Sequence, residues 1–393
     1  MRELRWRAAQ SHMQEAGPMT EATPRIRYVG LDVHKETITV AVAEESGRPE
    51  AWGTIANDPQ AVRRLVRQLA REGHQLRLAY EAGPTGYVLQ RQLTRLGVEC
   101  QVVAPSLIPK STSDRRVKTD TRDAEQLAKL LRSGDLVAIW VPDEEHEAFR
   151  EVVRARFVVK KDVERHRHQL VKLLLRWGLR PPAEVRRWSQ PYRRWLAELT
   201  HPLRDLQTAL DDFRSALWAA EERLAYLEKQ MSEAARRRPQ LALLVALQML
   251  HGVGELTSAT VVAEVGDFRR FARAGGFMNF AGLTASEHSS GERQQRGSIT
   301  KTGNSNLRHV FIQAAHNARH QPQPRTRLRQ RHEDAPADLV EMAARAHERL
   351  YHRYWHLARR IGREKAVVAV ARELAGFVWA MGQRMSESTQ QAA

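Results

Sequence analysis

Four acidic side chains in the first third of the chain have the spacing expected of ligands for a divalent metal ion. Asp32 and Glu81 each close a short apolar run, so each carboxylate is expected at the end of a buried strand. Asp120 and Asp123 stand three residues apart at the start of an expected helix, which lets both face one way. Hard carboxylate oxygens suit Mg²⁺ or Mn²⁺. Two such ions can clamp the attacking and leaving oxygens of a phosphodiester.

The elements that must position these acids follow the order of an α/β, ribonuclease-H-like domain over residues 25–143. Three β-like runs come first, and helices then alternate with strands. In such a sheet the first and fourth strands are neighbours, which would bring Asp32 and Glu81 together. The expected strands are 26–31, 37–43, 51–55, 76–80 and 99–103, and the expected helices are 57–71, 85–96 and 121–131. The polar, basic stretch 106–119 is expected to be a loop.

The middle segment, residues 144–235, is expected to be built from long helices. Apolar residues at spacings of three and four predict one helix over 149–177. After Pro181 and Pro182, apolar residues or alanine fill every a and d position from Leu203 to Met231. A strict heptad period indicates coiled-coil packing, with two ordinary amphipathic core helices as the alternative. The sequence leaves open whether the helices pair within one chain or between chains.

The first of these helices is strongly basic. Between residues 150 and 195 there are 14 Arg or Lys against four acidic residues, with Trp177, Trp188, Tyr192 and Trp195 interleaved. Cations for phosphates and flat rings for bases fit an RNA or single-strand surface. A solvated charged face with aromatic anchors to the core fits equally well. The cations predicted to contact nucleic acid are Lys160, Lys161, Arg165 and Arg167.

The C-terminal third, residues 236–385, is expected to be a third, mostly helical domain, followed by a frayed tail at 386–393. Gly252 and Gly254 join two helical runs and resemble a helix-hairpin-helix element, in which glycine lets backbone N–H groups approach a phosphate. A plain tight turn explains the same residues nearly as well. The expected helices are 241–250, 256–265, one beginning near 305, 336–360 and 363–381.

The composition narrows the class of partner. With 63 Lys and Arg against 46 acidic residues the formal net charge is +17, which favours a polyanion, most simply nucleic acid. Ribosomal and membrane-surface proteins share this bias. Cys100 is the sole cysteine, which excludes an internal disulfide and a cysteine-based zinc cluster and fits a cytoplasmic setting. Residues 1–24 have no apolar signal core and are expected to be a disordered leader, and no apolar stretch is long enough to span a bilayer.

Several short sequence motifs closely resemble those of the transposases of the insertion-sequence 110 family. The fit is best with that family's 1111 subgroup, and the Piv-type DNA invertases are relatives. The resemblance runs in order over about residues 26–320. The motifs on which the resemblance rests are Gly30–Lys35, Tyr80–Gly86, Lys118–Ala124, Ser289–Gly291 and Ile299–Asn304.

This resemblance implies a RuvC-like domain with a D-E-D-D metal site, a coiled-coil segment and a transposase domain with a serine nucleophile. It places the serine on Ser290, with the adjacent Ser289 as the other possible register. His34 is expected to have a structural role rather than to bind metal. The family also implies a structured bridge RNA that pairs with donor and target DNA. The implied metal ligands are Asp32, Glu81, Asp120 and Asp123.

The mechanism implied is strand exchange through a 5′-phosphoserine link, with Mg²⁺ or Mn²⁺ at the acids. A dimer or tetramer assembled by the coiled coil would let one subunit's acids serve another's serine. The phosphate contacts expected near the serine are Arg293, Arg296, Lys301 and Arg308. One rival is a metal-dependent nuclease or junction resolvase that uses water, and another is a non-catalytic nucleic-acid scaffold.

Overall fold

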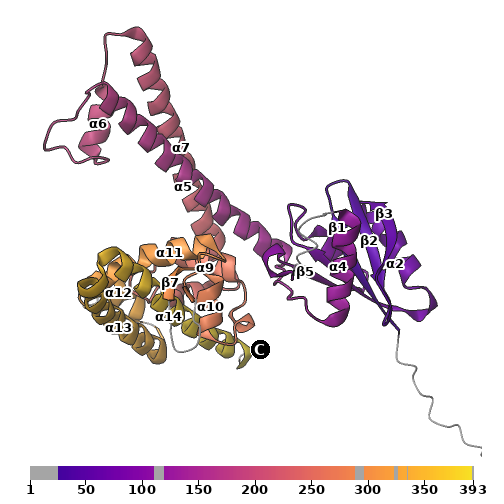
Figure 1. Ribbon diagram of the computed structural model, residues 1–393. Coiled ribbons are helices and arrows are strands. Elements are labelled where there is room, and N and C mark those ends of the chain that lie inside the picture. The colour runs from indigo at the N-terminus through magenta and orange to yellow at the C-terminus, as the bar shows by residue number, and fades with distance from the viewer. Residues whose placement is uncertain (1–24, 110–118, 288–295, 323–325, 334, 392–393) are drawn as a thin grey trace, which may run out of the picture. The chain divides into compact units, whose positions relative to one another are not determined.

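The protein divides into two compact units, Met1–Val141 and Pro142–Ala393 (Figure 1). The structure is a computed structural model, and it describes residues 25–109, 119–287, 296–322, 326–333 and 335–391. The segments 144–235 and 236–385, expected as separate domains, both fall within the second unit.

The first unit holds a five-stranded sheet in the order β3-β2-β1-β4-β5. β1 pairs antiparallel with β2 and parallel with β4, so the expected pairing of the first and fourth strands is confirmed. Because β1 and β4 are parallel, their carboxyl ends lie at the same edge of the sheet. The strands are β1 (Ile26–Val33), β2 (Thr37–Ala43), β3 (Glu50–Ala56), β4 (Gln75–Glu81) and β5 (Glu99–Val103), and the helices are α2 (Pro59–Leu69), α3 (Val88–Arg95) and α4 (Asp120–Ser133).

A close contact between β1 and α4 brings the acidic residues of the two elements together. Gly30 lies in the middle of β1, and a Cβ there would collide with the backbone carbonyl of Ala124 in α4. Only glycine permits this approach of helix to strand. Thr119 caps the helix, its side chain accepting a hydrogen bond from the amide of Arg122 (3.4 Å). The first turn of α4, which carries two of the predicted metal ligands, therefore begins beside the end of β1.

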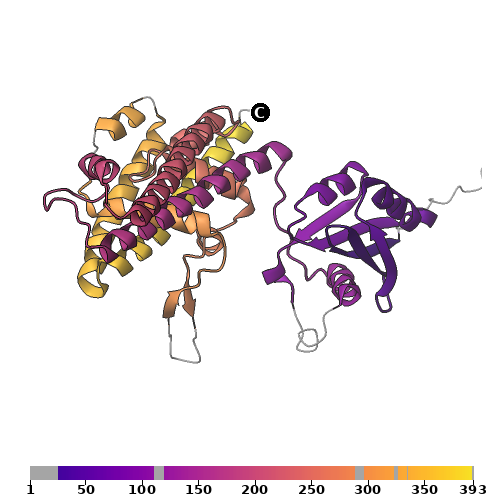
Figure 2. The same ribbon diagram turned by 90° about the horizontal axis from the view of Figure 1, so that it is seen from above.

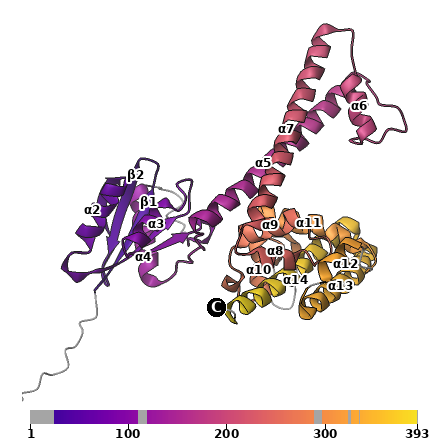
Figure 3. The ribbon, with the colours of Figure 1, turned by 180° about the vertical axis from the view of Figure 1, so that it is seen from behind.

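Two long helices of the second unit, α5 (Glu144–Arg176) and α7 (Arg204–Arg236), form a hairpin with the short α6 (Gln190–Glu198) at its far end (Figures 1 and 3). They run antiparallel, since Arg156 pairs with Glu228 and Arg167 with Glu221, each at 2.6 Å. The predicted heptad stripe is thus covered within the chain. Its buried members are Leu206, Leu210, Leu217, Ala220 and Met231.

Leu203, predicted as the first position of that heptad stripe, was assigned wrongly. It precedes α7 as its N-cap residue and its side chain is exposed. The aromatic residues of this segment were predicted either to contact bases or to anchor the charged helices to the core, and they differ in burial. Tyr192 is buried in a small core between the far ends of the hairpin, whereas Trp177 is 47% exposed. Tyr192 therefore anchors the charged helices rather than offering a surface for bases.

The near ends of α5 and α7 join the main core of the second unit, together with the C-terminal helices. The elements after α7 are α8 (Leu241–Leu247), α9 (Glu255–Val265), α10 (Ala274–Phe280), β6 (Ala285–Glu287), β7 (Arg296–Ile299), α11 (Ser305–Ala315), α12 (Thr326–His332), α13 (Ala337–Ile361) and α14 (Arg363–Gln391). β6 and β7 pair antiparallel and project from the helices (Figure 2). In the described part of the chain, no helix has the length and apolarity that a membrane crossing requires.

The frayed tail predicted after residue 385 is wrong for most of its length, because α14 continues to Gln391. Two polar side chains there find hydrogen-bond partners in the helix backbone. The hydroxyls of Ser386 and Ser388 donate to the carbonyls one turn earlier, of Gly382 and Arg384, at 2.9 and 3.0 Å. Polarity by itself does not end a helix when its groups find partners.

Candidate active site

Three side chains meet at the carboxyl edge of the first unit's sheet. Asp32 is the next-to-last residue of β1, and Asp120 opens α4. His34 Nε2 lies 3.2 Å from Asp32 Oδ2 and 3.4 Å from Asp120 Oδ2. Each of the three residues offers a ligand atom, and these atoms all lie within 4.8 Å of one another. The group is compact enough to surround one metal ion.

The other two predicted ligands share the surroundings of Asp32. Glu81 and Asp123 line the same open cavity as Asp32 and His34, with a volume of about 710 Å³. Glu81 reaches it from the end of β4, as the strand order requires, and Asp123 comes from one helical turn beyond Asp120. All four predicted acids therefore belong to one edge of the first unit.

Burial and neighbouring charges together shift the pKa of Asp32. Burial raises the pKa of this carboxyl, the nearby His34 lowers it, and the like charges of Asp120 and Asp123 raise it further, so the net pKa lies above the ordinary value. A bound cation would relieve this repulsion. The donor set is rich in carboxylate oxygen, which fits Mg²⁺ or Mn²⁺. The residues present therefore fit a divalent metal ion.

His34 has the geometry of a residue that orients the acids. Its backbone amide donates to Thr37 O (2.8 Å), and its own carbonyl accepts from the side chain of Asn57 (2.7 Å). The turn after β1 is thereby fixed, with the imidazole aimed at both carboxylates. A ring N–H that donates to a ligating carboxylate holds that ligand in place.

The predicted nucleophile belongs to a segment that the structure does not describe. Ser290 and its neighbour Ser289 lie outside the described residues, as does Arg293. The strands β6 and β7 flank this segment in the sequence, with Ala285 opposite Ile299. Arg296 is the first residue of β7, and its side chain lies outside the described part of the chain.

The remaining predicted phosphate contacts of the C-terminal third differ in their surroundings. Lys301 is exposed and has a left-handed backbone (φ 56°). Arg308 donates from Nη1 to the carbonyl of Ala281 (3.2 Å) and so braces the turn after α10. Gly252 (φ 88°) packs so closely on α11 that a Cβ would collide with a backbone carbonyl there, whereas Gly254, the N-cap residue of α9, has open space around its Cα. The close approach that needs glycine at position 252 is to protein.

The four cations predicted on α5 are also unequal. Lys160 Nζ lies 3.0 Å from His309 Nε2, and burial, followed by the neighbouring Arg156, lowers the pKa of this lysine. Arg165 pairs with an acid of its own helix, Asp162, at 3.0 Å. Arg167 is held by Glu221 and lies over the Trp188 ring, 5.0 Å from its centroid. Lys161 is exposed.

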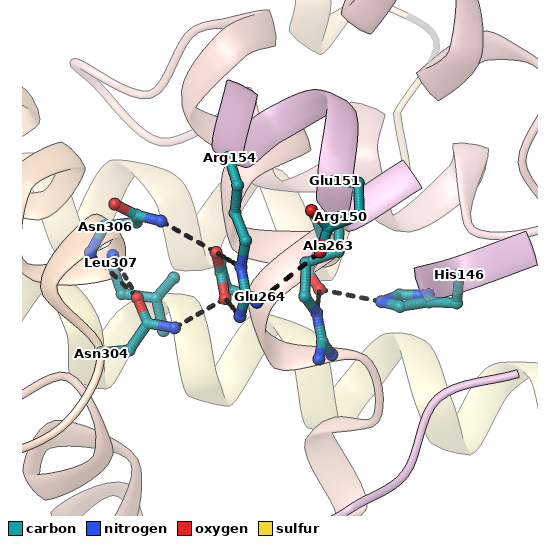
Figure 4. A network of polar contacts seen from close by, with 9 residues as sticks. All are labelled: His146, Arg150, Glu151, Arg154, Ala263, Glu264, Asn304, Asn306 and Leu307. Carbon is teal, nitrogen blue, oxygen red and sulfur yellow. Dashed lines mark hydrogen bonds and ion pairs between the residues drawn. The ribbon is translucent and has the colours of Figure 1, made fainter. Parts of the chain in front are cut away.

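A buried carboxylate that sequence reasoning missed organises the second unit (Figure 4). Glu264 in α9 is 3% exposed. Arg154 of α5 donates to both of its oxygens, at 3.1 Å each. Asn304 donates to Oε2 (2.7 Å) and Asn306 to Oε1 (3.0 Å). The one available signal was an acidic residue inside the apolar run 256–265.

This network ties three helices together. Asn304 also caps α11, because its Oδ1 accepts from the amides of Asn306 (3.0 Å) and Leu307 (2.9 Å). Burial by itself raises the pKa of Glu264, but the bonds from Arg154, Asn306 and Asn304 outweigh it and hold the pKa below the ordinary value. Asn304, the last residue of the motif 299–304, therefore stabilises the fold by linking α9 and α11.

Comparisons with known proteins agree along most of the chain. The DEDD transposase family model of the IS110 group matches residues 29–177, and a second family, described as transposase IS116/IS110/IS902, matches residues 245–329. The chain is 38% identical over 387 residues to the putative transposase y4qE of Sinorhizobium fredii, covering 95% of each chain. It is 31% identical over 334 residues to the transposase for insertion sequence element IS1533 of Leptospira borgpetersenii, covering 84% of this chain and 96% of that one. A more distant relative, 23% identical, is the transposase for IS1111A of Coxiella burnetii, with 74% and 73% covered.

Proposed function

The chain belongs to the IS110 family of insertion-sequence transposases, and on that premise we propose that it exchanges DNA strands through a covalent 5′-phosphoserine intermediate at Ser290. As a member it is a DNA-processing enzyme with a DEDD, RNase H-like domain. The finer steps are proposals, and they rest on the chemistry of the acidic edge and on the serine-glycine word at 290–291.

The observation that carries the proposal is the grouping of acids at one edge of the sheet. Two oxygens, from Asp32 and Asp120, lie within 4.8 Å of each other, although like charges repel. Glu81 and Asp123 would complete the ligand set, with Mg²⁺ or Mn²⁺ as the ion. A bound ion of this kind neutralises charge on the scissile phosphate and polarises its phosphorus–oxygen bonds.

The nucleophile would be the hydroxyl of Ser290. Its Oγ attacks phosphorus and gives up its proton, the bond from phosphorus to the 3′ oxygen breaks, and the 3′ oxygen gains a proton. In the second step a 3′-hydroxyl of the exchanged strand attacks the same phosphorus and gives up its proton, the bond from phosphorus to Ser290 Oγ breaks, and this Oγ regains a proton. Each step exchanges one phosphodiester bond for another, so no hydrolysis and no external energy source is needed.

The partners proposed are donor and target DNA, a structured bridge RNA that selects them by base pairing, and further copies of the chain as a dimer or tetramer. The buried a and d residues of α7 are covered by the hairpin and its core. An assembly would therefore use a different surface from the one that the heptad repeat predicted. Lys161 and Lys301 are exposed candidates for phosphate contacts.

The test is a covalent adduct assay with DNA carrying the element ends and RNA transcribed from the non-coding flank of the gene. We expect a protein–DNA adduct that survives denaturing electrophoresis. Ser290→Ala should abolish it, and Ser289→Ala, the matched neighbour, should retain it. Asp120→Asn should abolish cleavage but leave RNA binding unchanged. An adduct that persists in Ser290→Ala removes this serine from the mechanism, and hydrolysed ends without any adduct point to water as the nucleophile.

A further inference from the structure

The second unit contains a groove whose lining, apart from Lys301, has no part in the proposed chemistry. It has a volume of about 1060 Å³ and lies between the β6–β7 hairpin, the residue Lys301 and the helices α13 and α14. We call it the basic groove. Its charged lining consists of Lys301, Arg349, Arg353, Lys365, Arg372, Glu364 and Glu373.

We propose that the basic groove binds unpaired nucleotides of a DNA strand. Five cations face two carboxylates, so the lining attracts a polyanion. Lys301, Lys365 and Arg372 are exposed. The ion pairs of Arg349 and Arg353 both go to the single carboxylate of Glu373, which leaves the pair with a net positive charge.

Two of the cations are held in place by one carboxylate. Glu373 Oε2 accepts from Arg349 Nε (3.0 Å) and its Oε1 from Arg353 Nε (2.9 Å), which fixes two arginines one helical turn apart on α13. Lys365 and Arg372 stand seven residues apart on α14, so they share a face. Lys301 lines the groove from the segment between β7 and α11. Cations from three parts of the chain can therefore contact successive phosphates.

Part of the groove's lining is apolar, and this feature favours unpaired nucleotides over a duplex. A duplex presents its phosphates outward and keeps its bases stacked, so it would leave the apolar lining unused. An unpaired strand offers a flat base to an apolar surface and its phosphates to the surrounding cations. The larger apolar residues of the lining are Met278, Leu283, Ile299, Ile312 and Val368.

The choice of DNA rests on the proposed function, since strand exchange releases unpaired DNA beside the cut. The strands β6 and β7 that border the groove also flank Ser290 in the sequence. A groove beside them that holds the freed strand would keep its end available for rejoining.

The experiment measures binding alone, in the full-length Ser290→Ala protein, so that no cleavage interferes. Fluorescence anisotropy would follow a labelled oligothymidylate, its abasic counterpart, a duplex and an oligouridylate. The double variant Lys365→Gln/Arg372→Gln should weaken oligothymidylate binding roughly tenfold and reduce the salt-dependence slope by about 1.4, at about 0.7 per phosphate contact on a single strand. The matched control is Arg359→Gln/Arg360→Gln, two exposed cations of α13 that do not line the groove. It should change affinity less than about twofold.

Each arm either supports or overturns the proposal. Loss of affinity for the abasic strand supports a base on the apolar lining, and equal affinity overturns it. Equal weakening by both double variants means general charge attraction and overturns it as well, and so does preference for the duplex or for oligouridylate. Failure here would leave the adduct assay with Ser290 intact unaffected. Conversely, a groove that passes these tests in a protein that forms no adduct would remain a DNA site while the proposed chemistry fails.

Discussion

Two groups of carboxylates in this protein have opposite surroundings. Glu264 is buried and receives hydrogen bonds from Arg154, Asn304 and Asn306, and its pKa lies below the ordinary value. Asp32 lies beside Asp120 and Asp123, and burial first, then these like charges, hold its pKa above the ordinary value. A carboxylate with a full set of donors stabilises the fold. A carboxylate facing others of the same charge is better explained by a cation that it binds.

Burial therefore does not identify the functional acid here. Glu264 is 3% exposed, whereas the side chain of Asp120 is 58% exposed. What separates the two groups is the sign of the neighbouring charge. The comparison predicts that neutralising one group mainly affects activity and neutralising the other mainly affects stability.

The largest expected effect is on cleavage, through Asp32→Asn. Loss of one metal ligand removes several kcal/mol of transition-state stabilisation, so metal-dependent cleavage should fall about a thousandfold or more. The melting temperature without metal should hold or rise, because a repulsive charge is gone. Glu36→Gln is the matched control, an exposed acid paired with Lys35 beyond the cluster. Cleavage that persists in Asp32→Asn would contradict a metal role for this edge.

The next effect is on stability, through Glu264→Gln. The substitution keeps the shape of the side chain but removes the buried anion that accepts two hydrogen bonds from Arg154, and we expect the free energy of unfolding to fall by about 2–3 kcal/mol. Urea unfolding of the full chain measures it. Glu348→Gln, on the exposed surface of α13, should change it by less than about 0.5 kcal/mol. An unchanged midpoint in Glu264→Gln would mean that the network in Figure 4 does not stabilise the fold.

The two groups should also respond to acid with opposite signs. The pKa of Glu264 is lowered on folding, so its contribution is complete above the unfolded value of 4.5 and is lost as the pH falls through the folded value. The pKa of Asp32 is raised on folding above its unfolded value of 3.8. The folded protein therefore takes up this proton at a higher pH than the unfolded chain does, and it gains stability as the pH falls from the folded pKa of Asp32 to 3.8. Unfolding free energies measured against pH without metal should show the first trend vanish in Glu264→Gln and the second in Asp32→Asn.

Much of the first unit follows from the sequence, because its information is local. Apolar runs set the five strands, and Asp58, within the expected helix 57–71, starts α2 because its side chain accepts from two amides at 2.8 Å. The meeting of Asp32 with Glu81 at one edge follows from strand order. The contact of α4 with β1 does not, since Gly30 reveals a close approach only when its partner Ala124 is known.

Less of the second unit follows from the sequence, because the contacts that define it join residues far apart in the chain. Glu264 and Arg154 are 110 residues apart, and nothing near either residue indicates the other. A heptad stripe is the same whether its partner helix is in the same chain or in another. A count of cations does not separate Arg167, which Glu221 holds, from the exposed Lys161. Charge and period locate a surface, but pairing decides which side chains remain available on it.

The smallest expected effect is on metal affinity, through His34. Here we test whether His34 orients the carboxylates of the acidic edge as Arg154 orients that of Glu264. Its Nε2 lies within 3.4 Å of both Asp32 and Asp120, close enough to orient the two carboxylates through a ring N–H. His34→Ala should weaken metal binding about tenfold, the low end of what an orienting partner contributes. His34→Gln, which keeps an N–H donor, should recover part of that loss. Titration with Mn²⁺, followed by its paramagnetic signal, measures both. If the ring instead binds the metal directly, glutamine will not rescue affinity. The acidic edge would then differ from Glu264 in a second respect, because an imidazole would be one of its metal ligands.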